Sequence, residues 1–371
     1  MKFSFSSEQE EFRSNLRRLL ADRSSTNEVR RLMETDQGYE RDGWRAINTA
    51  LGLTAIRIPE AYGGYGLGFG DQCLVLEEMG RALLCAPYFA TAVLAAGAVV
   101  NAGTEAEKEA LLPGIAAGDT TATLAWVEDN GLWDPGGTAL TAAVDGGETV
   151  LNGHKSYVID GHSADLIVVL ARAPQGLSLF AVDGDAAGLT RRLLKSMDPT
   201  RKIARLEFNR VAARPLGTTG CAAAPFARTM VEAAVALANE MVGGADRLRE
   251  DALAYAMMRV QFGRPIASFQ SMKHKHADML LEVELAKSAS YYAAASLDDG
   301  DDDAPANAHL AKACASDAYM QTAIHAVQIH GGTGFTWDDD THLWFKRAKS
   351  SEVFLGDANY HRELMLQNWP A

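Results

Sequence analysis

Two short stretches in the last third of the chain carry side chains suited to a phosphorylated ligand. Arg259 begins the run Arg-Val-Gln-Phe-Gly, which contains Phe262, and Gln270 follows shortly after it. A planar guanidinium matches a pyrophosphate through two parallel hydrogen bonds. In the second stretch, Gln328 precedes the pair Gly331-Gly332, which would let backbone approach a ligand where side chains would clash.

Both stretches also have a structural interpretation. Taken alone, Arg259 is typical of a surface charge, and Gly331-Gly332 is typical of the end of a helix. His330, which lies just before the glycines, is interpreted as a structural residue rather than a catalytic one. From these residues alone, both interpretations stay open.

Composition and charge limit the class of partner. The chain has 371 residues and a net charge of -13, from 35 basic and 48 acidic residues. Nucleic acid is therefore not expected as the main partner, because a phosphate backbone needs a basic surface. No apolar run reaches the ~20 residues that span a bilayer, and residues 1–16 lack the apolar stretch of a signal peptide. We expect no membrane association and a cytoplasmic location.

The sequence predicts no metal site. The four cysteines have neither a C-x-x-C pair nor zinc spacing, and we expect them to be buried small hydrophobic residues. They are Cys73, Cys85, Cys221 and Cys314. The acidic run at residues 298–303 fails the EF-hand pattern and is interpreted as a solvated connection between two helices.

The order of predicted elements is helices, then strands, then helices. Residues 1–118 read as mostly helical, and residues 119–222 contain short β-branched runs separated by turn residues. Residues 223–371 return to long helical stretches. This order predicts a segregated α+β architecture with three domains at those boundaries.

Local signals refine these elements. Ser7 and Glu10 form a possible capping box, and the helix from Glu105 is expected to stop at Pro113-Gly114. The dipeptides Gly146-Gly147 and Asn152-Gly153 are candidate turns between strands.

Four motifs, spread over most of the chain, together resemble the acyl-CoA dehydrogenase family. Pro59–Gly64 is similar to the family's P-E-x-Y-G-G loop, and Asn152–Val158 is similar to N-G-x-K-x-[WY]-[IV]. Arg259–Gly263 resembles R-x-x-F-G, and Gln328–Gly334 resembles Q-x-x-G-G-x-G. The resemblance implies an N-terminal helical domain, a central β-barrel-like domain and a C-terminal four-helix bundle.

The resemblance also implies FAD as cofactor, an acyl-CoA substrate, and electron-transfer flavoprotein as the electron acceptor. It implies a homodimer or homotetramer in which Arg259 reaches the FAD of a neighbouring subunit. Tyr157 could instead be a packed aromatic residue of the sheet. The cofactor-binding residues that the resemblance implies are Trp126, Val127, Tyr157, Ile159, Arg259, Phe262, Gln270, Gln328, Ile329, Gly331, Gly332, Asp357 and Asn359.

The chain departs from the family at its flavin strands. Val127 and Ile159 stand where the family has threonines that bond the flavin, so two side-chain hydrogen bonds of ~1 kcal/mol each are missing. Backbone groups at Trp126, Val127 and Ile159 could replace them.

The resemblance also implies a carboxylate base that removes the α-proton of the acyl thioester, and the chain lacks this base at the family's usual positions. Much of the family carries it as the Glu of a Y-E-G-T motif, and Leu355 stands at that position here. Other members carry it on the long helix before R-x-x-F-G, where Ala233 stands. We rank Glu240 first, because it lies two turns along the same helix face in an apolar run. Asp357 ranks second and Glu232, which neighbours Ala233, ranks third.

Each candidate base has an alternative role. Glu240 could form a structural ion pair with a basic residue of a facing helix. Asp357 could cap a helix that begins near Ala358. Glu232 is interpreted first as a solvated helix charge.

Three functions are compatible with these residues. Our main prediction is FAD-dependent α,β-dehydrogenation of an acyl-CoA thioester to the enoyl-CoA. The alternative is a non-catalytic subunit in a heterotetramer with an active paralogue, which the missing Glu and the altered flavin strand favour. A third possibility is an oxidase that passes electrons to oxygen.

Overall fold

The computed structural model describes residues 5–369, which divide into two compact units. A helical unit contains the chain up to Arg30, Phe69–Leu84 and the chain from Ala234 onward. A sheet unit contains Arg31–Gly68 and Cys85–Ala233. The predicted α+β class is confirmed, because helices precede and follow a segment of strands. The domain boundaries near residues 118 and 222 stay a prediction.

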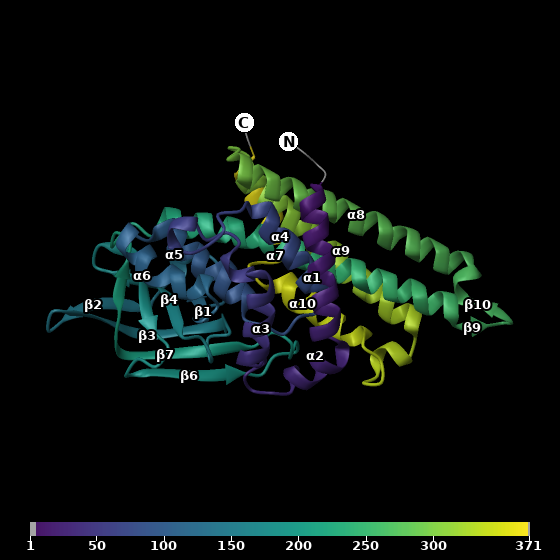
Figure 1. The fold of residues 1–371 in the computed structure, drawn as a ribbon, viewed down its shortest axis with the longest axis horizontal. Helices are drawn as coiled ribbons and strands as arrows, with labels where there is room; N and C mark the ends of the chain where they lie inside the picture. The colour runs from purple at the N-terminus through teal and green to yellow at the C-terminus, as the bar shows by residue number, and fades with distance from the viewer. Residues whose placement is uncertain (1–4, 370–371) are drawn as a thin grey trace. The chain divides into compact units, whose positions relative to one another are not determined.

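Long helices build the helical unit, and α9 packs against α8, α10 and α11 (Figure 1). Its helices are α1 (Ser7–Arg23), α4 (Phe69–Arg81), the larger part of α7 (Ala223–Met258), α8 (Gln270–Asp299), α9 (Ala304–His330), α10 (Thr341–Val353) and α11 (Ala358–Gln367). A shorter helix, α2 (Thr26–Met33), lies where the chain passes from the helical unit into the sheet unit.

Helix α7 continues through Gly243-Gly244 because these glycines serve close packing. A Cβ atom on Gly243 would lie 1.8 Å from the carbonyl oxygen of Glu77 in α4. In the opposite direction, a Cβ atom on Gly80 of α4 would lie 1.9 Å from the carbonyl oxygen of Glu240. The backbones of the two helices therefore touch, which only glycine permits.

The capping box of α1 lies one residue before the predicted one. The Ser6 hydroxyl accepts the N–H of Gln9, and the Gln9 amide oxygen accepts the N–H of Ser6. Gln9 also donates to the carboxylate of Asp71 in α4 at 2.8 Å. The prediction from Ser7 and Glu10 was wrong because this contact between helices selects the other register.

The acidic run is confirmed as a connection between helices. It joins α8 to α9, with Gly300 in the left-handed conformation. Asp298 accepts the N–H groups of Phe69 and Gly70, and so satisfies backbone donors at the start of α4. Within residues 5–369, no group of His, Cys, Asp and Glu side chains could hold a metal ion.

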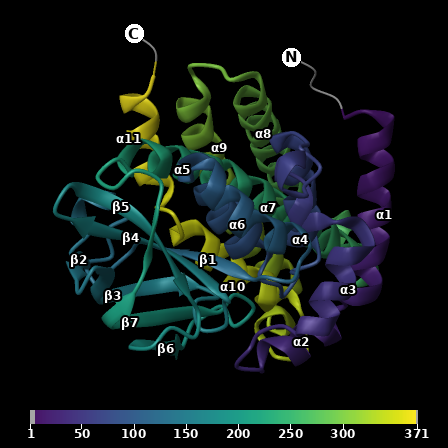
Figure 2. The same ribbon diagram turned by 60° about the vertical axis from the view of Figure 1, so that its left-hand side comes forward.

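The sheet unit centres on an eight-stranded mixed sheet in the order β6-β7-β3-β2-β4-β5-β8, with β1 parallel to β4 (Figure 2). Its strands are β1 (Ala122–Ala125), β2 (Thr141–Asp145), β3 (Glu148–Ile159), β4 (Leu166–Ala173), β5 (Gly176–Asp183), β6 (Leu189–Leu194), β7 (Ile203–Ala212) and β8 (Arg214–Leu216). Its helices include α3 (Arg41–Leu51), the π-helical segment Phe89–Ala95, α5 (Ala96–Ala102) and α6 (Glu105–Ala116).

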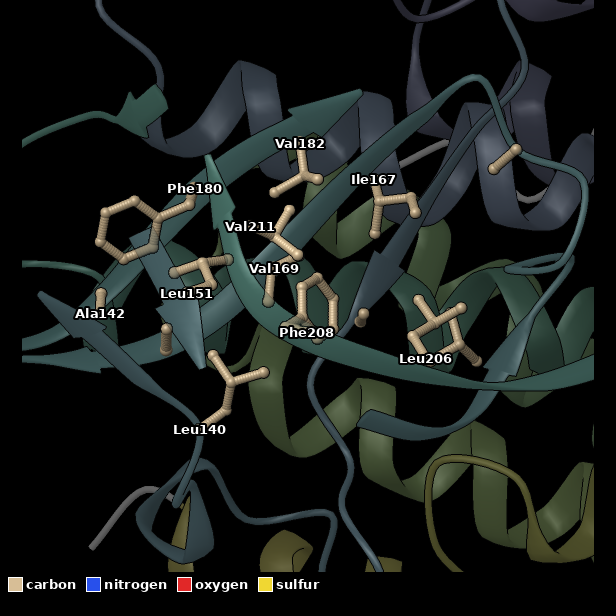
Figure 3. Close-up of a cluster of buried hydrophobic side chains, with 14 of the residues drawn as sticks. Leu140, Ala142, Leu151, Ile167, Val169, Phe180, Val182, Leu206, Phe208 and Val211 are labelled. Atoms are coloured by element: carbon tan, nitrogen blue, oxygen red, sulfur yellow. The ribbon is translucent and has the colours of Figure 1, made fainter. Parts of the chain in front are cut away.

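Apolar side chains from several strands form the core of the sheet (Figure 3). Leu151 of β3, Val169 of β4 and Leu206 of β7 are fully buried there, and Phe180 of β5 is nearly so. Strands β4 and β5 are buried along most of their length, as their apolar sequences predict.

One predicted turn is confirmed and the other is wrong. Gly146-Gly147 joins β2 to β3, and both glycines have the positive φ that a tight hairpin needs. Asn152-Gly153 instead lies inside β3, where the register with β7 shifts and Gly153 has φ 132°. The Asn152 side chain accepts the N–H of Arg210 of β7 at 2.9 Å, so the pair forms a β-bulge.

Two smaller predictions also fail. Helix α6 does not stop at Pro113 but continues to Ala116, where its last residues are buried. Cys73 and Cys85 are buried as expected and Cys314 partly so, but Cys221 is exposed in the loop before α7. Of the helices in the described part of the chain, none is long and apolar enough to cross a membrane.

Candidate functional site

A buried lysine organises the loop after β1. The Lys155 ammonium donates to the carbonyl of Trp126 at 2.9 Å and to the Glu128 carboxylate at 2.8 Å. Burial lowers the pKa of Lys155 to about 8, with Glu128 opposing the shift. Burial alone would raise the pKa of Glu128, but Lys155 and the N–H groups of Ala139 and Leu140 hold it below its usual value.

Val127 leaves a backbone donor unused in this loop. The residue is 3% exposed, and its carbonyl accepts the N–H of Ser156 at 2.8 Å. Its own N–H donates to no group among residues 5–369. Because buried N–H groups without an acceptor are rare, this position fits an acceptor from outside the chain.

Tyr157 lies at a second irregularity of β3. The register with β7 shifts between Lys155 and Val158, and Tyr157 has φ 58°. Its side chain is 45% exposed, so the interpretation as a packed sheet aromatic was wrong. The left-handed conformation turns this side chain out of the alternation of the strand. Ile159, two residues later, is buried, and its carbonyl accepts the Thr123 hydroxyl at 2.6 Å.

The Arg-Val-Gln-Phe-Gly run folds as a two-residue hairpin. Strands β9 (Val260–Gln261) and β10 (Arg264–Pro265) pair at the end of α7 and project from the helices (Figure 1). Phe262 and Gly263 form the turn, and both have the positive φ that such a hairpin requires. Phe262 is 91% exposed, and its ring meets that of Phe269 edge to face.

Arg259 stands at the base of this hairpin. Its backbone is fixed, since its N–H donates to Tyr255 and its carbonyl accepts the N–H of Ile266, both at 2.8 Å. Its guanidinium is exposed and forms no ion pair or hydrogen bond within the described chain. Gln270, the first residue of α8, is also exposed, with no hydrogen bond to its side chain from residues 5–369.

The end of α9 supports both interpretations of its glycines. Gly331 ends the helix with φ 65° and ψ -144°, a conformation essentially restricted to glycine. A Cβ atom on Gly331 or Gly332 would meet nothing within 4 Å, so open space lies beside this backbone. Gln328 is exposed and accepts a hydrogen bond from Lys275 at 2.8 Å, whereas Ile329 is buried.

His330 has a structural environment, as expected. Its Nδ1 atom lies 2.8 Å from the carbonyl oxygen of Ala326 and therefore donates to it. Its ring stacks on Tyr255 with 4.2 Å between centroids. These contacts join α9 to α7 within the helical unit.

The turn between α10 and α11 contains the displaced base position. Leu355 has φ 65° and is 5% exposed, and Gly356 follows with φ 108°. The Asp357 carboxylate accepts the N–H of Tyr360 at 2.8 Å, so the alternative that it caps a helix from Ala358 is confirmed. Asp357 and Asn359 are both exposed.

Glu240 has the partner that its alternative role requires. The Arg347 guanidinium of α10 donates to its carboxylate at 2.8 Å, and both side chains are less than a tenth exposed. This is an ion pair with a basic residue of a facing helix.

Glu232 is buried, so its interpretation as a solvated charge was wrong. It is 3% exposed and contacts α5 through Asn101. Arg57 and Asn101 donate to Oε2 at 3.1 and 3.2 Å, and Arg228 donates to Oε1 at 3.3 Å. No local pattern pointed to Arg57, which lies 175 residues away in the chain.

Comparison with known proteins covers almost the whole chain. Family models of the acyl-CoA dehydrogenase N-terminal, middle and C-terminal domains match residues 6–119, 123–211 and 224–369. Acyl-CoA dehydrogenase IpdE2 of Mycobacterium tuberculosis is 32% identical over 354 residues, which are 94% of this chain and 93% of the relative. The chain belongs to the acyl-CoA dehydrogenase family.

Solved structures agree with this assignment. A variant of the Tcur3481–Tcur3483 steroid ACAD is 31% identical, with a TM-score of 0.88 and 97% of each chain covered. The ChsE4–ChsE5 complex from Mycobacterium tuberculosis is 26% identical, with a TM-score of 0.90 and 100% of each chain covered.

This acyl-CoA dehydrogenase is an oxidoreductase with FAD as its cofactor. The residues present fit that cofactor. In the sheet unit, the Val127 N–H lacks an acceptor among the described residues. In the helical unit, Gly331 and Gly332 leave backbone open to a ligand, and Arg259 offers a guanidinium that has no partner in the described part of the chain. Each unit thus contains groups that the folded chain leaves unsatisfied.

Proposed function

We propose that this chain oxidises an acyl-CoA thioester to its enoyl-CoA as part of an oligomer, in the cytoplasm, with electron-transfer flavoprotein as electron acceptor. FAD, when bound, accepts the β-hydride of the acyl group. Val127 and the exposed Tyr157 would hold it from the sheet unit, together with Trp126 and Ile159. Gln328 and Gly331-Gly332 would hold it from the helical unit, together with Ile329, Asp357 and Asn359.

The hairpin of β9 and β10 carries the oligomer proposal. A fixed backbone presents Arg259, Phe262 and Gln270 outward. Among residues 5–369, the ring of Phe269 contacts Phe262, and no hydrogen bond or ion pair holds the side chains of Arg259 and Gln270. An exposed Phe beside an unpaired guanidinium suits a site completed by a second chain and its pyrophosphate. A homodimer, a homotetramer or a heterotetramer with a paralogue would each supply that chain.

For the base we propose Glu232 in place of the first-ranked Glu240. The Glu240–Arg347 pair is buried on both sides, and separating it would leave an uncompensated charge. Glu232 is equally buried, but the side chain of Arg228 is 70% exposed and that of Arg57 is 22% exposed. The exposed Arg228 guanidinium can swing toward solvent, which would free the Oε1 atom of Glu232 to take the α-proton.

Matched substitutions separate the candidates. Glu232→Gln should keep its flavin and lose at least a hundredfold in the rate of flavin reduction by acyl-CoA, because the amide cannot take the proton. Glu240→Gln should be reduced at close to the wild-type rate but unfold at lower urea, since Arg347 loses its partner. Stopped-flow absorbance without oxygen measures the rate of flavin reduction in both variants, and urea unfolding measures their stability. Normal reduction in Glu232→Gln would eliminate that residue and return Glu240 to first place.

The second candidate function is a subunit that depends on a paralogue for its base. Leu355, buried at the position where the resemblance places the base, favours it because an alkyl side chain cannot accept a proton. The two solved structures above carry paired chain names, which suits this possibility.

One experiment distinguishes the two functions. The visible spectrum of the protein expressed alone is recorded before and after a panel of acyl-CoAs is added without oxygen. A flavin band that bleaches supports a self-sufficient dehydrogenase. A folded protein that binds no flavin, or whose flavin no acyl-CoA reduces, contradicts it and supports the dependent subunit.

A further inference from the structure

Backbone carbonyls converge on a buried lysine where α10 ends. Lys312 of α9 is fully buried, and its ammonium donates to the carbonyls of Glu352 and Gly356 at 3.2 and 3.1 Å. Its third acceptor is the Ser316 hydroxyl at 2.9 Å. Glu352 lies in the last turn of α10, where carbonyls lack partners within the helix and carry partial negative charge.

Two buried histidines, His361 and His309, hold the carbonyl of Leu355, which lies between Glu352 and Gly356 in the chain. His361 Nε2 of α11 lies 3.1 Å from the Leu355 carbonyl oxygen, so it must carry the proton and donate. Burial lowers the pKa of His361 to about 2 and that of His309 to about 4, which makes both rings neutral at pH 7. With Nε2 protonated, His361 Nδ1 is an acceptor, and His309 Nδ1 donates to it at 3.0 Å.

The tethered turn is one that an unsupported chain would avoid. Leu355 has φ 65°, which costs an ordinary residue roughly 1–3 kcal/mol. A Cβ atom on Gly356 would lie 2.1 Å from the ring of Tyr360, so glycine is required there. Such a conformation persists only where the surroundings impose it. Lys312 and His361 are those surroundings, because they donate directly to the carbonyls of Gly356 and Leu355, and His309 in turn donates to His361.

The strain has a visible consequence. It buries Leu355 and turns Asp357 and Asn359 to the exposed side of the turn. We propose that Lys312 and His361 are positioning residues, which fix this turn in the shape that presents Asp357 and Asn359 to the cofactor. The inference rests on the proposed function, because that function assigns Asp357 and Asn359 to FAD.

Simple packing does not account for the choice of these residue types. A buried ammonium costs more than an apolar side chain of similar volume unless its hydrogen bonds are needed. Each of the three polar side chains makes a directional bond that leads to the turn: His309 bonds His361, which bonds Leu355, and Lys312 bonds Gly356 separately. The cluster therefore defines backbone shape in addition to filling space.

The test compares variants that remove the bonds with one that keeps them. His361→Leu removes the donor to Leu355, whereas His361→Gln places an amide N–H near the position of Nε2. Lys312→Met keeps the length of the side chain and removes the ammonium. The control is His342→Leu, a buried histidine of α10 whose ring nitrogens make no hydrogen bond within residues 5–369.

Two quantities are measured for each full-length variant. One is hydrogen–deuterium exchange of the amides in residues 353–360 without FAD, and the other is the dissociation constant of FAD. In His361→Leu and Lys312→Met, we expect at least tenfold faster exchange and at least tenfold weaker FAD binding. In His361→Gln and His342→Leu, both quantities should stay within threefold of wild type. If His361→Leu does not fold, His309→Leu, which breaks only the first link, takes its place.

Two results would overturn the positioning role. One is unchanged exchange at the turn in His361→Leu and Lys312→Met. The other is faster exchange with wild-type FAD affinity, which would make the cluster merely structural. A wild-type protein that binds no FAD is a different result, because it contradicts the proposed function itself and removes the basis of this inference with it.

Discussion

The loop at Trp126–Glu128 and the hairpin at Arg259–Pro265 are both proposed to bind the flavin, yet they are built in opposite ways. In the loop, Lys155 and Glu128 are buried and satisfy each other. In the hairpin, the Arg259 guanidinium is exposed and has no partner within residues 5–369. The charged groups of the loop are satisfied when the chain folds, whereas the guanidinium of the hairpin is left for a partner from outside the described residues. Substitutions in the loop should therefore change folding, and substitutions in the hairpin should change binding.

The largest effect is expected from Lys155→Met. Removing the ammonium leaves the buried Glu128 carboxylate without its counter-ion and takes one donor from the Trp126 carbonyl, which should cost about 3–5 kcal/mol in the free energy of unfolding. Urea unfolding followed by circular dichroism measures the change. The matched control is Lys349→Met, whose partner Glu352 is solvent-accessible, and its cost should be below about 1 kcal/mol. An equal loss in the free energy of unfolding for Lys155→Met and Lys349→Met would contradict the view that buried contacts of Lys155 stabilise the loop.

Arg259→Ala should show the opposite pattern. FAD affinity should fall about 100-fold, because two charge-assisted hydrogen bonds to a pyrophosphate contribute roughly 3 kcal/mol. The free energy of unfolding without FAD should be unchanged, since the exposed guanidinium has no hydrogen bond or ion pair with residues 5–369 to lose. Fluorescence titration measures the affinity. Arg264→Ala is the control on the same hairpin, because that guanidinium lies 4.2 Å from the ring of Phe269. A loss of folding stability in Arg259→Ala without weaker FAD binding would contradict the prediction.

The stability of the loop should also depend on alkaline pH, because Lys155 titrates there. The pKa of Lys155 is lowered to about 8 in the folded chain and is about 10.4 when unfolded. Between these values the unfolded chain binds more protons, so stability contributed by this group rises with pH, by at most about 1.4 kcal/mol per unit. Below pH 8 both states are protonated and the contribution is flat. Urea midpoints at pH 7, 8, 9 and 10 should rise in wild type relative to Lys155→Met, and parallel curves would refute the assignment.

The smallest effect is expected from Phe262→Ala. The ring is 91% exposed, so the free energy of unfolding of the isolated chain should change by less than about 0.5 kcal/mol. Association of the chains should weaken, which analytical ultracentrifugation measures as a shift toward monomer. Phe269→Ala is the comparison, because Phe269 is only partly exposed and should cost more stability. A large loss of folding stability in Phe262→Ala would contradict the prediction, because it would show that the hairpin stabilises the isolated chain.

The sequence predicted the elements well where periodicity and turn chemistry decide the outcome. The long helices, the Gly146-Gly147 hairpin and the cap at Asp357 all follow from local patterns. The sequence failed where a distant partner decides. Gln9 selects the cap of α1 through Asp71, and Arg210 turns Asn152-Gly153 into a bulge.

The candidate bases make the same point. The sequence identified the acids as candidates but could not predict their partners, since Arg57 and Arg347 lie more than a hundred residues from the acids that they contact. A carboxylate's use depends on whether its partner can leave, and that depends on burial on both sides of the contact. Glu232 and Glu240 lie on one helix, and only their surroundings separate them.

The crossing of α4 and α7 constrains how this protein can evolve. Gly80 lies against the backbone of Glu240, and Gly243 lies against the backbone of Glu77, so each glycine makes room for the other helix. A mutation to any larger residue at either position would force the helices apart at both. It would also displace Glu240 from Arg347 and so reach α10. Neither glycine can drift alone, and a lineage that replaced one would have to rebuild the whole crossing.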